Sequence, residues 1–264
     1  MINIDKYAYL SKLKQTAPMK KLVFSLLTLG VCIWADSVAI SIPVLLIMGW
    51  CTVARGGTPL ALFIKLMLVP VSFLVIGVLT IGINVSENKD VFLFSVYSFG
   101  TYIGVSSSSI HNAVRLFSKA LGAVSCLYFL SLTTPMIDLL SALRRLKMPR
   151  LMVELMGLVY RFIFVFLETA DTMATAQNSR LGYSGLASGY RSLAGLASTL
   201  FIRAYKRSDE LYTALEARGY DGELNVLEEK FETHWTEYIP PVALNLLLVL
   251  IALFLKRHTG GVFL

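Results

Sequence analysis

The stretch LALFIKLMLVPVSFLVIGVLTIGI, residues 60–83, decides the class of fold, because it is apolar almost throughout and holds a single charged residue, Lys65. A helix rises about 1.5 Å per residue, so a segment of this length can cross the hydrocarbon core of a bilayer, which is about 30 Å thick. Pro70 should kink this helix, because proline lacks a backbone N–H and clashes with the preceding turn. We therefore predict a membrane-spanning helix over Leu60–Ile83.

The composition extends that prediction to the whole chain. Apolar residues make up 56% of the 264 residues and charged residues only 16%, which is more apolar surface than one soluble core of this size needs. The formal charge of +7 does not indicate a nucleic-acid partner, because the basic residues stand between apolar runs rather than in a stripe with aromatic residues. The predicted fold class is all-α, a polytopic membrane protein with about five transmembrane helices and a cytoplasmic part.

The positions of the basic residues predict how the chain is oriented in the membrane. The first apolar run is preceded by four lysines, Lys12, Lys14, Lys20 and Lys21, which places the N-terminus in the cytoplasm. The polar first twenty residues show no cleavable signal peptide. Arg55, with Gly56, Gly57 and Pro59, marks a loop on the same side.

Four further apolar segments complete the predicted spans: Leu22–Trp34, Val38–Val53, Ala113–Thr133 and Tyr238–Leu255. Asp36 and Ser37 separate the first two, which favours a hairpin of two short helices over one long kinked helix. Arg115 and Lys119 are expected to extend outward to the membrane surface. The aromatic, polar-ended stretch 84–112 is predicted to be an interfacial segment on the outer side. Five spans would place the basic Lys256 and Arg257 outside, against the usual bias.

The sequence indicates no metal, cofactor or catalytic site. Three cysteines, Cys32, Cys51 and Cys126, lie in apolar segments without a Cys-x-x-Cys spacing, so they are predicted to be packing residues. His111 could ligate a metal, but a lone histidine is more often a polar residue with an ordinary hydrogen bond. The chain has no GxxxxGK[ST] motif, so we expect no nucleotide chemistry and no enzyme activity.

Residues 135–236 are predicted to form a cytoplasmic domain of coupling helices between the membrane parts 1–134 and 237–264. The segment Leu151–Leu167 is apolar enough to resemble a span, but Glu154, Arg161 and Glu168 recur every seven residues along it. Because ionised residues are costly in a bilayer, we favour a helix along the inner face that continues to Arg180. A true span with a polar stripe is the alternative. An amphipathic helix follows over Leu186–Ala217.

Two similar motifs end these two helices. The first lies in ATAQNSRLGYSG, residues 174–185, and the second in LYTALEARGYDG, residues 211–222. The candidate partner-binding residues are Ser179, Arg180, Leu181 and Gly182 in the first motif, and Ala217, Arg218 and Gly219 in the second. Helices of about 30 residues are about 45 Å long, so the two arginines would reach separate sockets rather than one small ligand. The alternative interpretation is helix capping, with Gly182 or Gly219 in the left-handed position.

Three segments together resemble a known family: LTTPMIDLLSALRRLKMP, LVYRFIFVFLETADTMATAQNSRLGY and LYTALEARGYDGE. They are similar to the transmembrane coupling (T) component of energy-coupling factor transporters, of the CbiQ type found in cobalt and nickel systems. In that family two X-Arg-X motifs dock into grooves of two ATPase subunits, and here they correspond to Ser179-Arg180-Leu181 and Ala217-Arg218-Gly219. The first motif has Ser where many relatives have Ala.

The resemblance implies a scaffold in the bacterial cytoplasmic (inner) membrane that transmits ATP-driven motion during metal-ion import. It implies two ATP-binding cassette subunits, a metal-binding membrane subunit of the CbiM type and a small subunit of the CbiN type as partners, beside membrane lipid. One alternative is a channel or secondary transporter that conducts the ion itself, and metal binding by the isolated chain would favour it. An intramembrane enzyme would need paired nucleophile and base or metal ligands, which three scattered histidines do not supply.

Overall fold

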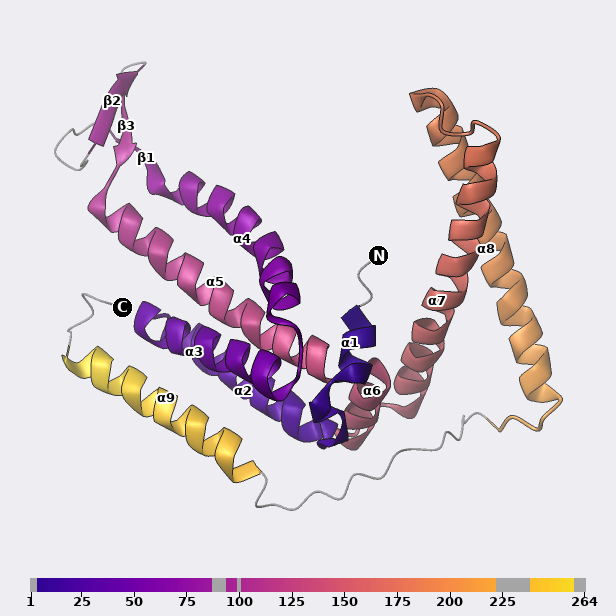
Figure 1. Ribbon diagram of the computed structural model, residues 1–264, viewed down its shortest axis with the longest axis horizontal. Helices are drawn as coiled ribbons and strands as arrows, with labels where there is room; N and C mark the ends of the chain where they lie inside the picture. The colour runs from indigo at the N-terminus through magenta and orange to yellow at the C-terminus, as the bar shows by residue number, and fades with distance from the viewer. Residues whose placement is uncertain (1–3, 87–93, 99–100, 222–237, 259–264) are drawn as a thin grey trace. The chain divides into compact units, whose positions relative to one another are not determined.

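The computed structural model is mostly helical and describes residues 4–86, 94–98, 101–221 and 238–258 (Figure 1). The chain divides into two compact units, one of Met1–Leu139 with Lys230–Leu264 and the other of Leu140–Glu229. Residues 222–237, which precede the last predicted span, and residues 87–93 and 99–100 of the predicted interfacial segment lie outside the described residues.

The first unit contains the helices that can cross a membrane. After α1 (Ile4–Leu10) and the 3₁₀ turn η1 (Lys12–Gln15) come α2 (Pro18–Ala35), α3 (Val38–Trp50) with the π-helical turn η2 (Cys51–Arg55), α4 (Leu60–Gly82), α5 (Ser107–Thr133) and α9 (Ile239–His258). Five segments of the described chain are long and apolar enough to span a bilayer: Pro18–Ala35, Val38–Arg55, Leu60–Gly82, Ser107–Thr133 and Ile239–Arg257. The predicted polytopic helical class and the five predicted spans are confirmed. α4 runs through Pro70 without interruption and bends along its length (Figure 1).

α2 and α3 form the predicted hairpin rather than one kinked helix. Asp36 takes a left-handed conformation (φ 44°) that reverses the chain. At the open end of the hairpin, Ser11 Oγ before α2 donates a hydrogen bond to the carbonyl oxygen of Gly56 after α3, at 2.9 Å. The two helices therefore run antiparallel, with their outer ends at the same end of the bundle.

α5 packs against α2, α3 and α4, and α9 packs against α2 and α3. The core between them consists of small and medium apolar side chains: Cys32, Ala35, Ile40, Val44, Met48, Cys51, Cys126, Phe129, Leu248 and Ala252. All three cysteines are free thiols buried in this cluster, which confirms that they are packing residues. Gly122 of α5 lets the helices approach closely, because a Cβ there would lie 2.9 Å from Cys32 Sγ and 3.1 Å from the carbonyl oxygen of Ser41.

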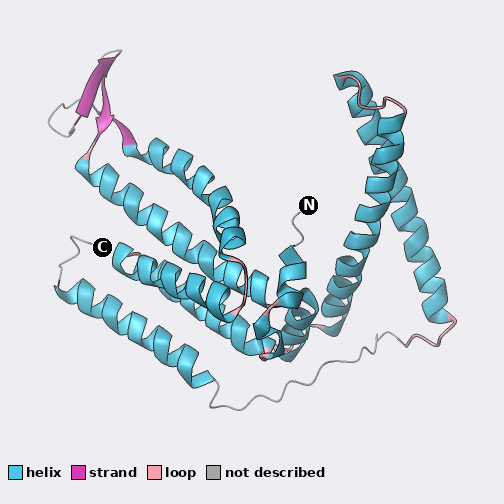
Figure 2. Cartoon of the chain, viewed as in Figure 1, coloured by secondary structure: helices cyan, strands magenta, loops and turns pink. Residues whose placement is uncertain are grey.

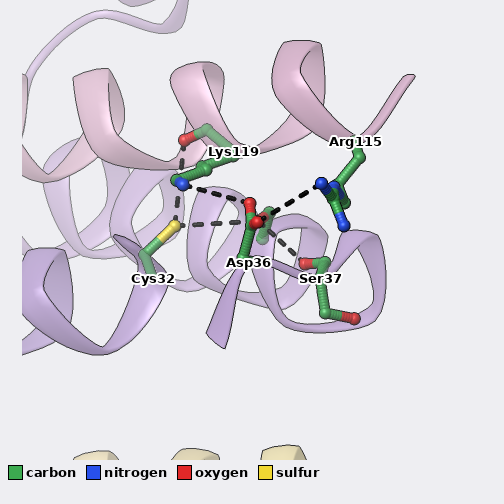
Figure 3. Close-up of polar contacts among 6 residues, drawn as sticks. Cys32, Asp36, Ser37, Arg115 and Lys119 are labelled. Carbon is green, nitrogen blue, oxygen red and sulfur yellow. Dashed lines mark hydrogen bonds and ion pairs between the residues drawn. The ribbon is translucent and has the colours of Figure 1, made fainter. Parts of the chain in front are cut away.

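An ion-pair cluster fastens the α2–α3 turn to the first part of α5 (Figure 3). The Asp36 carboxylate lies 3.0 Å from Lys119 Nζ and 3.6 Å from a guanidinium nitrogen of Arg115. The sequence predicted only that Arg115 and Lys119 extend to the membrane surface, and the structure adds that both cations pair with Asp36. The left-handed turn brings a carboxylate within reach of both cations, and pairing satisfies them better than extension alone.

The stretch after α4 forms a small sheet that the sequence did not indicate. β1 (Ile83–Ser86), β2 (Phe94–Ser98) and β3 (Thr101–Val105) pair antiparallel in the order β1-β3-β2, with Ile83 opposite Val105 and Tyr97 opposite Tyr102. Figure 2 shows these strands at the shared end of α4 and α5. β-branched and aromatic residues favour strands, and α5 already begins at Ser107 rather than at residue 113.

A buried lysine organises the opposite end of this unit. Lys21 of α2 is 3% exposed, and its Nζ donates to the carbonyl oxygen of Thr133 at 2.8 Å and to that of Leu13 at 3.1 Å. The carbonyl groups in the last turn of a helix have no partner within the helix, so the ammonium caps the C-terminus of α5. The start of α2 and the end of α5 are thereby fixed together.

The second unit is an elongated pair of helices. α6 (Met136–Arg145) leads into it, and α7 (Arg150–Ser179) and α8 (Leu186–Glu216) follow, joined by residues 180–185. α7 is absent from the segments that meet the length and composition criteria for a span. The predicted bounds of these helices, residues 151–180 and 186–217, agree with the structure to within one residue at each end.

Candidate functional site: the arginine-bearing ends of α7 and α8

The α7–α8 hairpin exposes most of its surface. No residue of α8 is buried within the described structure. Its exposed apolar side chains lie on one face of the helix and include Leu186, Tyr190, Leu193, Phe201, Tyr205 and Tyr212. The opposite face carries Arg191, Arg203, Lys206 and Arg207, as expected for an amphipathic helix.

At the end of α7, two backbone hydrogen bonds with a spacing other than the four residues of an α-helix close the last turn. The N–H of Gly182 donates to the carbonyl oxygen of Gln177 at 2.8 Å, and the N–H of Leu181 donates to that of Asn178 at 3.0 Å. Leu181 lies in the left-handed region with φ 61°. Arg180 is the residue immediately before it, and its side chain is exposed. We call residues 179–182 the first tip.

Side chains brace the first tip from both helices. Gln177 Nε2 donates to the carbonyl oxygen of Ser192 at 3.0 Å, while Tyr183 Oη donates to Gln177 Oε1 at 2.7 Å. Ser192 Oγ donates to the carbonyl oxygen of Gly182 at 2.8 Å. A Cβ at position 182 would lie 2.6 Å from Ser192 Oγ and 2.8 Å from the carbonyl oxygen of Gln177, so only glycine fits there. No local pattern in the sequence indicates this bracing, because its members are 6 to 15 residues apart.

The end of α8 closes in the same way. The N–H of Tyr220 donates to the carbonyl oxygen of Leu215 at 3.1 Å, and the N–H of Gly219 donates to that of Glu216 at 3.0 Å. Gly219 lies in the left-handed region with φ 75°, and the exposed Arg218 comes immediately before it. We call residues 217–219 the second tip.

A tyrosine lies beside the second tip. The pKa of Tyr212 is raised, chiefly because its hydroxyl group hydrogen-bonds the Glu216 carboxylate and also because that negative charge opposes ionisation. The hydrogen bond to Glu216 therefore favours the neutral hydroxyl form of Tyr212.

Both ends are Schellman motifs, in which a left-handed residue turns the chain back over the last carbonyl groups of a helix. Arg180 and Arg218 occupy the same position in the two motifs. The capping expectation is confirmed for Gly219 but wrong for Gly182, because the left-handed residue of the first tip is Leu181. The glycine is one position later there, where the close contacts require it. A non-glycine residue in this conformation costs about 1–2 kcal/mol.

The two tips cannot share one small ligand. α8 separates them and has 31 residues, so at about 1.5 Å per residue it is about 46 Å long. Figure 1 shows the tips at opposite ends of α8. Within the described residues no group of three or more His, Cys, Asp and Glu side chains is placed to hold a metal ion.

Comparison with known proteins identifies the family. A family model described as CbiQ, cobalt transport protein, matches residues 10–229. The cobalt transport protein CbiQ of Salmonella typhimurium is 32% identical over 228 residues, covering 86% of this chain and all of that protein. A putative fused cobalt transport protein CbiMQ of Methanocorpusculum labreanum is 29% identical over 86% of this chain and 38% of its own length.

A further relative is a transmembrane protein of an energy-coupling factor transporter. The energy-coupling factor transporter transmembrane protein EcfT of Staphylococcus aureus is 28% identical over 60% of this chain and 63% of its own. The family match covers most of the chain, including α7, α8 and both tips. The chain therefore belongs to the CbiQ family of cobalt transport proteins, the transmembrane (T) components of energy-coupling factor transporters.

Proposed function

We propose that this chain is the coupling subunit of an energy-coupling factor transporter for cobalt or nickel uptake. We further propose that its two tips dock into grooves of two ATPase subunits. The observation that carries the proposal is the geometric equivalence of Arg180 and Arg218, each exposed immediately before the left-handed residue of a Schellman motif. Capping explains the turns. It does not require an arginine at the same position in both.

An arginine side chain suits such docking. A guanidinium group in an acidic groove makes charge-assisted, often bidentate hydrogen bonds that contribute about 1.5–3 kcal/mol each when partly desolvated. Because α8 fixes the spacing of the two arginines, a rotation of one ATPase relative to the other would act on a rigid lever of about 46 Å. We propose that this lever transmits the ATP-driven motion to the membrane.

The chemistry is divided among subunits in this proposal. ATP hydrolysis belongs to the two ATPases, since the chain lacks a phosphate-binding GxxxxGK[ST] loop and acts as a non-catalytic subunit. Metal binding belongs to a separate membrane subunit of the CbiM type, with which a small CbiN-type subunit would associate. The name of the fused CbiMQ relative supports this pairing, because it joins the two kinds of chain in one protein.

The proposed orientation has α6, α7 and α8 on the cytoplasmic side of the bacterial inner membrane. It is supported by the way in which basic segments gather at one end of the first unit. The hydrogen bond from Ser11 to Gly56 joins the lysine-rich start of α2 to the chain after Arg55, and Lys21 joins both to the end of α5. Positive charge concentrates in cytoplasmic segments of membrane proteins.

Charge reversal at the tips tests the docking role. Arg180→Glu and Arg218→Glu should each weaken co-purification of the ATPase subunits by about tenfold or more, because a carboxylate in an acidic groove replaces attraction by repulsion. The double variant should lose ATPase association and metal uptake together. The measurement is pull-down of the co-expressed ATPases from detergent-solubilised membranes, with uptake of radioactive cobalt in the same cells.

Arg203→Glu is the matched control, because Arg203 is exposed on the polar face of α8 and away from both tips. It should leave association and uptake at the wild-type level. If the double reversal at the tips still co-purified with full ATPase activity and transport, the coupling role would be wrong.

A further inference from the structure

The two tips differ at one structurally equivalent position. The left-handed residue is Leu181 in the first tip and Gly219 in the second. Glycine adopts this conformation readily, whereas leucine is strained in it. The backbone of the first tip is therefore strained at Leu181, whereas the backbone of the second tip is unstrained at Gly219.

No packing in the described structure compensates for this strain. The Leu181 side chain is 74% exposed. The bracing contacts of the first tip are made by Gln177, Tyr183, Ser192 and the backbone of Gly182, and the hydrogen bonds of Leu181 itself are backbone bonds that glycine would make equally well. Strained residues held by a rigid surrounding are typical of binding sites.

The bracing fixes the direction in which the side chain is presented. Hydrogen bonds hold the backbone on both sides of Leu181, at Gln177 and at Gly182 to Tyr183, so the turn cannot relax without breaking them. An apolar side chain is thus held in solvent next to the exposed Arg180. At the second tip a Cβ built on Gly219 meets no atom of the described residues within 4 Å.

We propose that Leu181 is a specificity-determining residue, which inserts into an apolar pocket beside the acidic groove that receives Arg180. This inference rests on the proposed docking of ATPase subunits. Its new content is that the two tips bind in non-equivalent ways: the first by an arginine and an apolar side chain, the second by an arginine with a bare backbone that a partner can approach closely.

Substitution of Leu181 tests the inference separately from the docking proposal. Leu181→Asn retains a residue that tolerates the left-handed conformation but removes the apolar side chain. Burial of a leucine side chain corresponds to an affinity change of about tenfold to a hundredfold, so Leu181→Asn should weaken binding by at least about tenfold. Leu181→Met should restore most of the affinity. The probe is the pair of ATPase subunits that co-purifies with the wild-type chain, and the titration uses the full chain in lipid nanodiscs.

Leu181→Gly separates binding from folding. It should weaken binding as Leu181→Asn does, while the thermal midpoint of the purified chain stays at or above the wild-type value, because glycine relieves the strain. Binding at the wild-type level by both variants, while Arg180→Glu loses it, would overturn the role of Leu181 and leave the docking proposal intact. Wild-type binding by Arg180→Glu as well would overturn both.

Discussion

At the residue scale, the Lys21 ammonium group is the polar centre of the membrane unit. Lys21→Met should lower the free energy of unfolding by about 1–3 kcal/mol, because it removes the donor from two carbonyl oxygens, of Thr133 and of Leu13, while the methionine keeps the apolar stem. Thermal unfolding of the purified chain in detergent measures this. Lys65→Met is the control, since Lys65 is exposed on α4 and should change the midpoint little. Equal midpoints for the two variants would contradict a structural role for Lys21.

At this scale, the sequence did not predict the cap formed by Lys21 or the backbone conformation of the first tip. Lys21 is one of the four lysines, Lys12, Lys14, Lys20 and Lys21, that precede the first apolar run, and their spacing indicates cytoplasmic charge but not which of them caps α5. Arg180 and Arg218 could be found because a glycine follows each of them within two residues at a helix end. Leu181 was a candidate as the neighbour of Arg180, but its left-handed conformation was not predicted, because Gly182 was expected to be the left-handed residue. The one available signal was the spacing: glycine follows Arg218 directly but is two residues after Arg180.

At the element scale, the packing of α5 depends on Gly122. Gly122→Ala should separate α5 from α2 and α3 and destabilise the chain by about 1–3 kcal/mol, because the added methyl group would meet Cys32 Sγ and the Ser41 carbonyl oxygen closer than van der Waals contact allows. Gly30→Ala on α2 is the matched control, since a Cβ there meets nothing within 4 Å. Alanine also favours helices over glycine, so Gly30→Ala should be neutral or stabilising. A stabilising effect of Gly122→Ala in the same thermal unfolding assay would show that the approach of the helices is looser than the structure gives.

Elements were predictable where local pattern decides them. Apolar runs about as long as a bilayer is thick gave the spans, and a period near 3.6 residues gave α8. The sheet was missed because strand pairing joins Ile83 to Val105, 22 positions apart, and no local periodicity reports that contact. The ion pairs of Asp36 with Arg115 and Lys119 were missed for the same reason: they depend on how the α2–α3 turn meets α5.

At the scale of the whole molecule, the direction of the helices predicts the topology. α2 and α3 are antiparallel, and α5 ends where α2 begins, as the hydrogen bond from Lys21 to Thr133 requires. Figure 1 shows α9 running in the same direction as α2 within the first unit. Five crossings therefore place the start of α2 and the end of α9 on opposite sides. The charges of Lys256 and Arg257 oppose this, but the lysines before α2, Arg55 and the basic end of α6 outnumber them.

Cysteine accessibility tests this topology. Ser184→Cys, in the loop between α7 and α8, should react with a membrane-impermeant maleimide only in inverted vesicles, and Arg257→Cys, at the end of α9, only in intact cells. The wild-type chain is the control: its three cysteines are buried, so it should stay unlabelled in both preparations. Labelling of Ser184→Cys in intact cells would mean that α7 crosses the membrane. The first tip would then lie outside, away from any cytoplasmic ATPase, because Arg180 is only four residues before position 184. Docking of two ATPases at the two tips would have to be abandoned even though the family assignment stands.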